Sequence, residues 1–297
     1  MPRSAKPSIA IIGTGRLGGA LALALQRSGY PIVGLVAGHL RKAEAAARML
    51  RLVGNSDGPL VLTAKDLNRL PSSDIVLIST PDDEIEKLAR RLAAHADTRT
   101  VLHTSGALSS VVLAPLSRKG LHIGSLHPLV SVSESKAGAD ALAGAFFCVE
   151  GDPHAIRVAR RIVRDLKGSA FSIPTGKKAL YHAAAVIASP HTTALFDLAV
   201  NTLVAAGLDR KTARRVLIPL LESTVQNLKT SDPADALTGT FARGDIATVK
   251  RHLKALSGRE HKQVLQVYRL LGLHSLELAK TNGLDPKLLN AIRRLLK

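Results

Sequence analysis

A glycine-rich loop near the start of the sequence constrains the fold more than any other feature. Residues 13–18 follow an apolar run at 9–12 and lead into a helical pattern at 17–28. At this spacing the first glycine permits a tight turn, the second lets a pyrophosphate approach the backbone, and the third allows close helix–strand packing. We therefore predict a dinucleotide-binding loop, although a glycine turn without a ligand has the same pattern. The residues expected to bind are Gly13, Thr14, Gly15, Arg16, Leu17 and Gly18.

The first half of the chain alternates short apolar runs with helical patterns. The runs are too short for buried helices and lack polar alternation, which is typical of strands covered on both faces of a parallel sheet. Strand–helix alternation then predicts a doubly wound, mostly parallel α/β Rossmann fold. The expected strands are 9–12, 32–37, 60–62, 75–79, 100–103, 122–126, 146–149 and 170–173, and the helices are 17–28, 41–52, 85–94 and 155–166.

The pattern changes after a Pro-Thr-Gly segment at 174–176, beyond which no strand is expected. Helical spacing covers 178–206, 210–228, 246–257 and 259–281, and a short last helix begins at Asp285-Pro286. We expect two domains, a nucleotide-binding Rossmann domain at 1–174 and an all-helical domain at 175–297.

The end of the second strand indicates which dinucleotide is preferred. NAD sites usually place a carboxylate there for the ribose hydroxyls, but this segment has no acidic residue before Glu44. His39, Arg41 and Lys42 would suit a 2′-phosphate. We therefore expect NADP, with NAD less favoured; the alternative is that Arg41 and Lys42 are solvated residues of the next helix.

Polar residues follow several strands where a cofactor crevice should lie. Thr80 and Pro81 follow the strong strand at 75–79 and are expected beneath the ribose and nicotinamide. Ser105 follows the next strand, and His127, flanked by Pro128, follows the one after. His127 could serve the chemistry or could be a loop histidine with satisfied hydrogen bonds.

Two further candidates lie in the helical half. Lys178 and His182 are four residues apart and share one helix face, and a lysine at the domain junction could protonate a developing alkoxide or amide. A surface lysine beside a buried histidine is the alternative. Arg243 could bind a substrate carboxylate, or its segment could be a plain turn in which Asp245 caps the next helix.

Composition and charge argue against nucleic-acid binding, a metal site and a membrane span. The formal charge of +18 is divided between 1–174 (+8) and 175–297 (+10), and aromatic residues make up 3%, so stacking groups for nucleic acid are scarce. The single cysteine, Cys148, permits neither an internal disulfide nor a cysteine zinc site, and we expect a small core residue. The histidines and carboxylates show no paired spacing that would predict a metal site. Without a secretory pattern or an apolar run of about 18 residues, we expect a soluble cytoplasmic protein and no membrane span.

Five motifs, taken together, resemble a known family over nearly the whole chain. The chain is similar to Rossmann-like proteins whose second domain is the domain of unknown function 2520 (DUF2520). The motifs are Gly13-Thr14-Gly15-Arg16-Leu17-Gly18, His103-Thr104-Ser105-Gly106-Ala107-Leu108, Gly124-Ser125-Leu126-His127-Pro128-Leu129, Tyr181-His182-Ala183-Ala184-Ala185, and Leu237-Thr238-Gly239 with Arg243-Gly244-Asp245.

The resemblance implies a relation to pyrroline-5-carboxylate reductase, ketopantoate reductase and the 3-hydroxyisobutyrate dehydrogenase group. It implies a helical domain similar to that of 6-phosphogluconate dehydrogenase, and a homodimer formed through it. In the 3-hydroxyacid dehydrogenases a lysine lies four residues before an asparagine; Lys178 matches that lysine, but His182 replaces the asparagine. Pro190 and Thr240 also depart from the DUF2520 pattern, which has Asn and Pro there, so substrate contacts should differ.

The resulting hypothesis is an NADP(H)-dependent oxidoreductase that reduces a C=O or C=N group of a small carboxylate. Lys178 would donate the proton, and His127, Ser105 and His182 would position the substrate. A non-catalytic dinucleotide sensor or scaffold, and a deazaflavin:NADP oxidoreductase, are the alternatives.

Overall fold

The computed structural model describes residues 6–52 and 58–297, and it divides the chain into two compact units, Met1–Ser189 and Pro190–Lys297. The boundary expected at residue 174 lies one helix earlier than this division. The difference concerns α7 (Lys178–Ala188), whose first turn is hydrogen-bonded to the sheet of the first unit.

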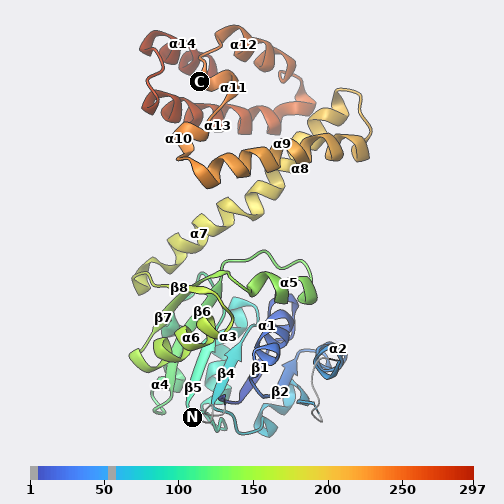
Figure 1. Ribbon diagram of the computed structural model, residues 1–297, viewed down its shortest axis with the longest axis vertical. Coiled ribbons are helices and arrows are strands. Elements are labelled where there is room, and N and C mark those ends of the chain that lie inside the picture. Colours follow the sequence, from blue (N-terminus) through green and yellow to red (C-terminus); the bar gives the residue numbers. More distant parts are fainter. Residues whose placement is uncertain (1–5, 53–57) are drawn as a thin grey trace. The chain divides into compact units, whose positions relative to one another are not determined.

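The first unit is built on one sheet with the order β3-β2-β1-β4-β5-β6-β7-β8 (Figure 1). All neighbours in it pair in parallel except β6 and β7, which are antiparallel. The doubly wound, mostly parallel fold is therefore confirmed. The strands are β1 Ile9–Ile12, β2 Ile32–Ala37, β3 Leu60–Thr63, β4 Ile75–Ile78, β5 Thr100–His103, β6 His122–Pro128, β7 Phe146–Gly151 and β8 Ser169–Phe171.

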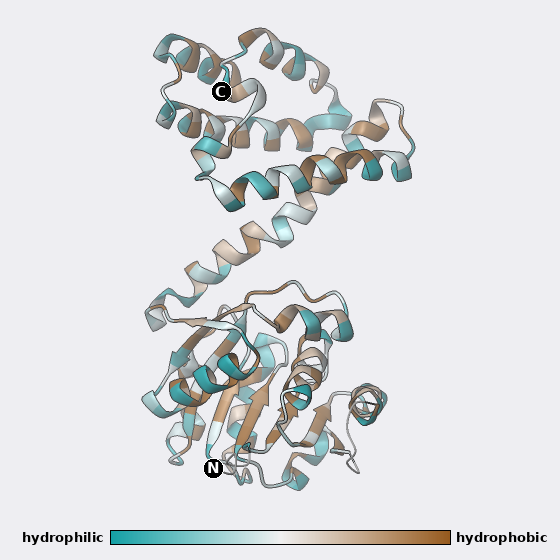
Figure 2. Ribbon diagram, in the orientation of Figure 1, coloured by the Kyte–Doolittle hydropathy of each residue, from teal (hydrophilic) through white to brown (hydrophobic). Residues whose placement is uncertain are grey.

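Alternate residues of the central strands face two separate hydrophobic cores. In β1, Ile9 and Ile11 pack with α1, α2, α5 and α6, whereas Ala10 and Ile12 pack with α3 and α4. Burial on both faces explains why the strands lack polar alternation, and the brown strands lie between more hydrophilic helices in Figure 2. These helices are α1 Arg16–Arg27, α2 Leu40–Arg51, α3 Asp82–Leu92, α4 Ala114–Ser117, α5 Ser135–Leu142 and α6 Pro153–Asp165, with short 3₁₀ turns at Ala64–Arg69, Ser110–Leu113 and Thr175–Lys177.

The second unit is helical throughout its length. Its small core is formed by Val249, Leu276, Ile292 and Leu296. Val200 is the buried residue of α8 and Ala213 that of α9, so both helices leave most of their apolar side chains at least partly exposed. The helices are α8 Pro190–Ala205, α9 Arg210–Thr230, α10 Pro233–Ala236, α11 Gly239–Ala242, α12 Ile246–Ala255, α13 Lys262–Thr281 and α14 Pro286–Leu296, with a 3₁₀ turn at Arg259–His261.

One helical run bears on the expectation that no segment spans a membrane. Thr175–Ala205 is long and apolar enough to cross a membrane by length and composition, and little of it is buried. The sequence argument divided this stretch at residues such as Pro190 and His191, which interrupt its apolar runs. The run is weak evidence for a span, because Ser189 leaves the helical conformation and Lys178 is hydrogen-bonded to the sheet unit.

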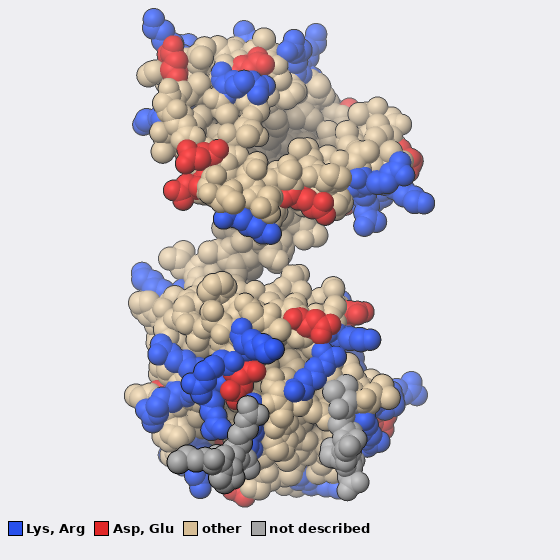
Figure 3. Space-filling model, in the orientation of Figure 1, with Lys and Arg blue, Asp and Glu red and all other residues tan. Residues whose placement is uncertain are grey.

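Charged side chains of both signs are distributed over both units (Figure 3). Four exposed arginines stand on α6, at positions 157, 160, 161 and 164, and none of them forms an ion pair with a described carboxylate. The large positive charge is therefore partly carried by one helix of the sheet unit and is otherwise dispersed.

Candidate active site at the carboxyl edge of the sheet

The glycine loop has the steric requirements that its spacing predicts. Gly13 has φ +100, and a Cβ there would overlap the backbone of Ser79 after β4. A Cβ on Gly18 would overlap the carbonyl of Gly13, so helix and strand approach closely only with glycine. Gly15 faces open space within 4 Å. The loop thus leaves room for a ligand at its middle glycine.

Several unpartnered polar groups point to an anionic ligand at this loop. α1 begins with Gly15 as its N-cap, has no side-chain cap and no acidic residue in its first turn, so its first N–H groups and its dipole are free for an anion. The hydroxyls of Thr14 and Thr80 are buried without a hydrogen-bond partner, which is uncommon for buried polar atoms. Free N–H groups and hydroxyls at this loop fit the pyrophosphate and ribose of a nicotinamide dinucleotide.

A cavity of about 270 Å³ adjoins the loop between the ends of β2 and β4. Gly13, Gly38, Thr80, Pro81 and Glu84 contribute to its lining. His39 is the N-cap residue of α2, but its side chain makes no capping hydrogen bond. The first turn of α2 has no acidic residue. His39 and Arg41 are exposed beside this cavity without lining it.

Lys178 is the central feature of a polar cluster beyond the loop. Its side chain is 2% exposed, so the alternative of a surface lysine is wrong. The ammonium donates to Ser125 Oγ at 2.8 Å and to the carbonyl oxygen of Ser105 at 3.2 Å. Burial lowers the lysine pKa below its usual value, and the carboxylates of Glu150 and Asp82 partly oppose that effect. The cluster therefore holds a buried cation with one N–H left for another acceptor.

His127 lies beside this lysine, on the same face of β6 as Ser125. Its Nδ1 is 2.7 Å from the hydroxyl of Tyr181 on α7, and its ring meets that of His182 edge to face at 5.7 Å. Burial, and then the charge of Lys178, lower the pKa of His127 to about 4. His127 is thus a neutral imidazole at physiological pH, not a charged one.

Gly106, in the loop that follows β5, packs closely against the imidazoles of His127 and His182. A Cβ at this position would overlap the His182 ring and would lie 2.7 Å from Nε2 of His127. The hydrogen atom of glycine is therefore required for both histidines to approach the Ser105–Gly106 backbone.

The hydroxyl of Ser105 is committed to its own loop. It donates to Asp82 Oδ2 at 2.9 Å and accepts from the N–H groups of Ala107 and Leu108. This arrangement fixes the loop against α3. A substrate would more readily meet the neighbouring histidines than this hydroxyl.

Sequence reasoning assigned no role to three residues of the cluster, Tyr181, Glu150 and Asp82. The buried Glu150 accepts from the backbone N–H and the hydroxyl of Ser110, at 2.5 and 2.9 Å, and from Thr175 at 3.4 Å. An acidic residue within the apolar run 146–150 was an available signal. Tyr181 was visible three residues after Lys178, on the same helix face.

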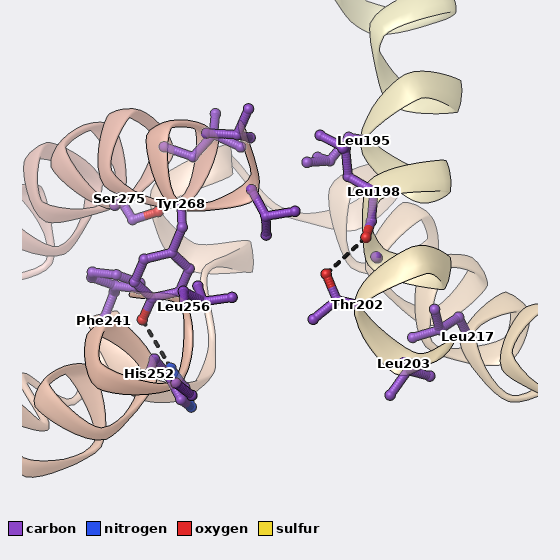
Figure 4. Close-up of a pocket in the computed structure, with 16 residues that line it drawn as sticks. Leu195, Leu198, Thr202, Leu203, Leu217, Phe241, His252, Leu256, Tyr268 and Ser275 are labelled. Atoms are coloured by element: carbon purple, nitrogen blue, oxygen red, sulfur yellow. Dashed lines mark hydrogen bonds between the residues drawn. The ribbon is translucent and has the colours of Figure 1, made fainter. Parts of the chain in front are cut away.

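Arg243 and the second cavity belong to the helical unit. Arg243 is exposed, and Asp245 accepts from the Thr248 N–H at 2.9 Å and caps α12, as the alternative interpretation expected. A cavity of about 480 Å³ is lined mainly by apolar side chains (Figure 4). Three of its polar side chains are already hydrogen-bonded: Thr202 donates to the Leu198 carbonyl, and Tyr268 pairs with His252. This cavity suits apolar contacts, not a carboxylate.

No group of three potential metal ligands occurs in the part of the chain that the structure describes.

Comparison with family models identifies both halves of the chain. Residues 2–128 match the Rossmann-like domain, and residues 145–275 match the domain of unknown function DUF2520. The chain carries a Rossmann-like domain and a DUF2520 domain. The resemblance predicted from the five motifs is confirmed. No curated protein matches the sequence of this Rossmann-like, DUF2520-containing chain.

Solved structures share the fold of the whole chain. A protein from Thermotoga maritima is 24% identical, with a TM-score of 0.69, covering 92% of this chain and 99% of its own. A candidate NADP oxidoreductase from Bacteroides fragilis is 22% identical, with a TM-score of 0.72 and coverages of 90% and 96%. Pyrroline carboxylate reductase from Plasmodium falciparum, solved with NADP bound, is 13% identical, with a TM-score of 0.57 and coverages of 99% and 99%. At these identities the likeness concerns the fold.

Proposed function

We propose that this protein is an NADP(H)-dependent oxidoreductase that reduces a C=O or C=N group of a small carboxylate. The observation that carries the proposal is the presence, at one edge of the sheet, of a dinucleotide cradle and a buried lysine–histidine cluster. Parallel α/β sheets bind ligands outside the carboxyl ends of their strands, and β1, β4, β5 and β6 all end there.

The cradle residues would hold the dinucleotide in two places. The first turn of α1 and the hydroxyls of Thr14 and Thr80 would bind the pyrophosphate and ribose. His39 and Arg41 would contact the 2′-phosphate of NADP, since no carboxylate stands at the end of β2. When bound, the dinucleotide supplies the hydride; the protein groups supply orientation and the proton.

The cluster would act on the substrate. The cationic Lys178 favours an anionic substrate, and its remaining N–H can donate to an oxygen or nitrogen of the reacting group. His127 and His182 border the same space around Gly106 and would orient that group. Ser105 would act indirectly, because its hydrogen bond to Asp82 holds the loop that follows β5 in place.

A direct test is a screen of NADPH oxidation against 2-keto acids, ketopantoate and cyclic imines, with NADPH binding measured separately. We expect turnover with at least one class and its loss in Lys178→Met. Tight NADPH binding without any turnover would instead support the non-catalytic sensor, and turnover that survives in Lys178→Met would remove the lysine from the mechanism.

We also propose that the protein is soluble and forms a homodimer through its helical unit. Seven large apolar side chains of α8 and α9 are exposed to solvent in the single chain: Leu195, Val204, Val216, Ile218, Leu220, Val225 and Leu228. Apolar patches of this kind are typical of protein interfaces. A second copy presents the same surface and so offers a self-complementary partner.

A further inference from the structure

The hydrogen bond between His127 and Tyr181 determines which nitrogen of the histidine carries its proton. A neutral imidazole has one N–H, on Nδ1 or Nε2, and the partner of one nitrogen fixes the other. His127 is neutral because burial lowers its pKa to about 4, and burial raises the pKa of Tyr181 far above its usual range, so the phenol keeps its proton. Two neutral groups therefore share the 2.7 Å contact.

The surroundings of Tyr181 favour donation from the phenol to Nδ1. Its other polar neighbours are the thiol of Cys148, which is a weak donor and a weak acceptor, and the ammonium of Lys178, which lies 5.5 Å from the ring centroid and cannot accept a hydrogen bond. The neighbouring Phe171 has no polar atom. If Nδ1 carried the proton, the best acceptor left to the phenol among these neighbours would be the sulfur. Donation from the phenol to Nδ1 gives both groups their stronger partner, and the imidazole proton then resides on Nε2.

Nε2 of His127 lies beside Gly106. It forms no hydrogen bond to a described residue, although Nδ1 does, and it is absent from the fully buried unpartnered atoms of the described chain. A Cβ at Gly106 would lie only 2.7 Å from Nε2, so this glycine packs closely against one side of the atom. A ligand would therefore reach the N–H from the side away from Gly106.

We propose that Tyr181 is a positioning residue that locks His127 in the Nε2–H form, so that the site presents a neutral hydrogen-bond donor to its substrate. The inference rests on the proposed function and deepens it. A donor at Nε2 binds a reacting group through a lone pair, as on a carbonyl oxygen or an imine nitrogen. It does not act as a base toward an alcohol, which would need Nε2 unprotonated. Together with the ammonium of Lys178, His127 then offers the reacting group two hydrogen-bond donors.

The helical unit contains a second pair with the same geometry, which provides a matched control. His252 Nδ1 lies 2.9 Å from the Tyr268 hydroxyl, and the rings meet at 5.7 Å and 87°. The corresponding values for His127 and Tyr181 are 2.7 Å, 5.6 Å and 87°. The control pair belongs to the second unit and borders the apolar cavity of Figure 4.

The tautomer can be measured without a substrate by ¹⁵N NMR of the full-length protein labelled at histidine. We expect the His127 signals to show an unprotonated Nδ1 and a protonated Nε2 at neutral and mildly alkaline pH. Tyr181→Phe should mix the two tautomers of His127, whereas Tyr268→Phe should change His252 and leave His127 as it was. A protonated Nδ1 in the wild type, or an unchanged tautomer in Tyr181→Phe with native signal dispersion, would overturn the proposal.

Kinetics give a second readout that separates the two proposals. With a carbonyl substrate from the screen, Tyr181→Phe should lower kcat/KM about tenfold, the scale of one hydrogen bond, without changing the NADPH Kd. Tyr268→Phe should leave kcat/KM unchanged. If the wild type turns over nothing, the proposed function fails while the NMR result still decides the tautomer; an unaffected kcat/KM in Tyr181→Phe rejects the positioning role alone.

Discussion

Lys178 illustrates how burial changes the chemistry of a single residue. Its carbon chain and ammonium are enclosed by the sheet unit, and two of its three N–H groups are satisfied by Ser125 and by the Ser105 backbone. Burial nevertheless lowers the pKa of Lys178, so these hydrogen bonds do not fully replace the hydration that the ammonium has in water. Such residues are common at functional sites.

The lysine predicts a specific pH dependence of stability. Because its pKa is lower in the folded than in the unfolded protein, the unfolded state binds more protons between the two values. The free energy of unfolding therefore rises with pH from the folded pKa up to about 10.4, the unfolded value. Urea unfolding of wild type and Lys178→Met at several alkaline pH values checks this: only the wild type should gain from this group. Parallel pH curves for both proteins would contradict it.

The same residue should control activity. Lys178→Met should lower kcat by roughly 10²-fold or more if the ammonium donates the proton. The wild-type rate should fall at alkaline pH below the usual lysine range, because the folded pKa is lowered. The pH–rate profile of kcat is the measurement, and a profile that stays flat through that range excludes the lysine as donor.

Gly106 makes a second residue-scale prediction. Gly106→Ala should destabilise the protein by about 1–3 kcal/mol, because its Cβ would overlap His182 and approach His127. It should also abolish turnover by displacing both rings. Gly176→Ala is the control, since nothing lies within 4 Å of that position and its φ is not positive. Thermal unfolding of both variants measures the two losses of stability. Equal losses would show that the rings of His127 and His182 move aside without a cost in stability.

At the scale of elements, the sequence predicts the sheet unit well and the cluster only in part. The buried strands were located to within about two residues, because burial on both faces leaves an unbroken apolar run. α5 was missed, since Ser135–Leu142 follows a stretch of alternating serines and has only three buried residues. The contacts of Lys178 were not predictable, because they join residues 53 and 73 positions apart.

The first turn of α2 should decide the cofactor. Arg41→Ala should raise the Kd for NADPH at least about tenfold, since a charge-assisted hydrogen bond to phosphate is lost, and should leave the Kd for NADH unchanged. Arg48→Ala, in the last turn of the same helix and equally exposed, is the control. Titration calorimetry with both dinucleotides measures the effect. Equal weakening of NADPH and NADH would assign Arg41 no role in recognising the 2′-phosphate.

At the scale of the whole molecule, the helical unit predicts self-association. The exposed apolar faces of α8 and α9 should be covered in a dimer, so Leu220→Glu on α9, where Leu220 is 63% exposed, should yield monomers. Leu52→Glu, in the sheet unit and also exposed, should leave the dimer intact. Sedimentation velocity of the three proteins checks this, and a monomeric wild type at micromolar concentration would contradict it.

The attachment of α7 to the sheet unit has a consequence for the modularity of this protein. The first compact unit ends at Ser189. It contains Lys178, Tyr181 and His182 as well as the glycine loop. A fragment cut at residue 174 would lose all three, whereas one cut after Ser189 would keep every hydrogen bond of the cluster. The chemical groups at the sheet edge are therefore all contained in the first unit, and exchange of the helices beyond Ser189 would leave the lysine, both histidines and the tyrosine in place.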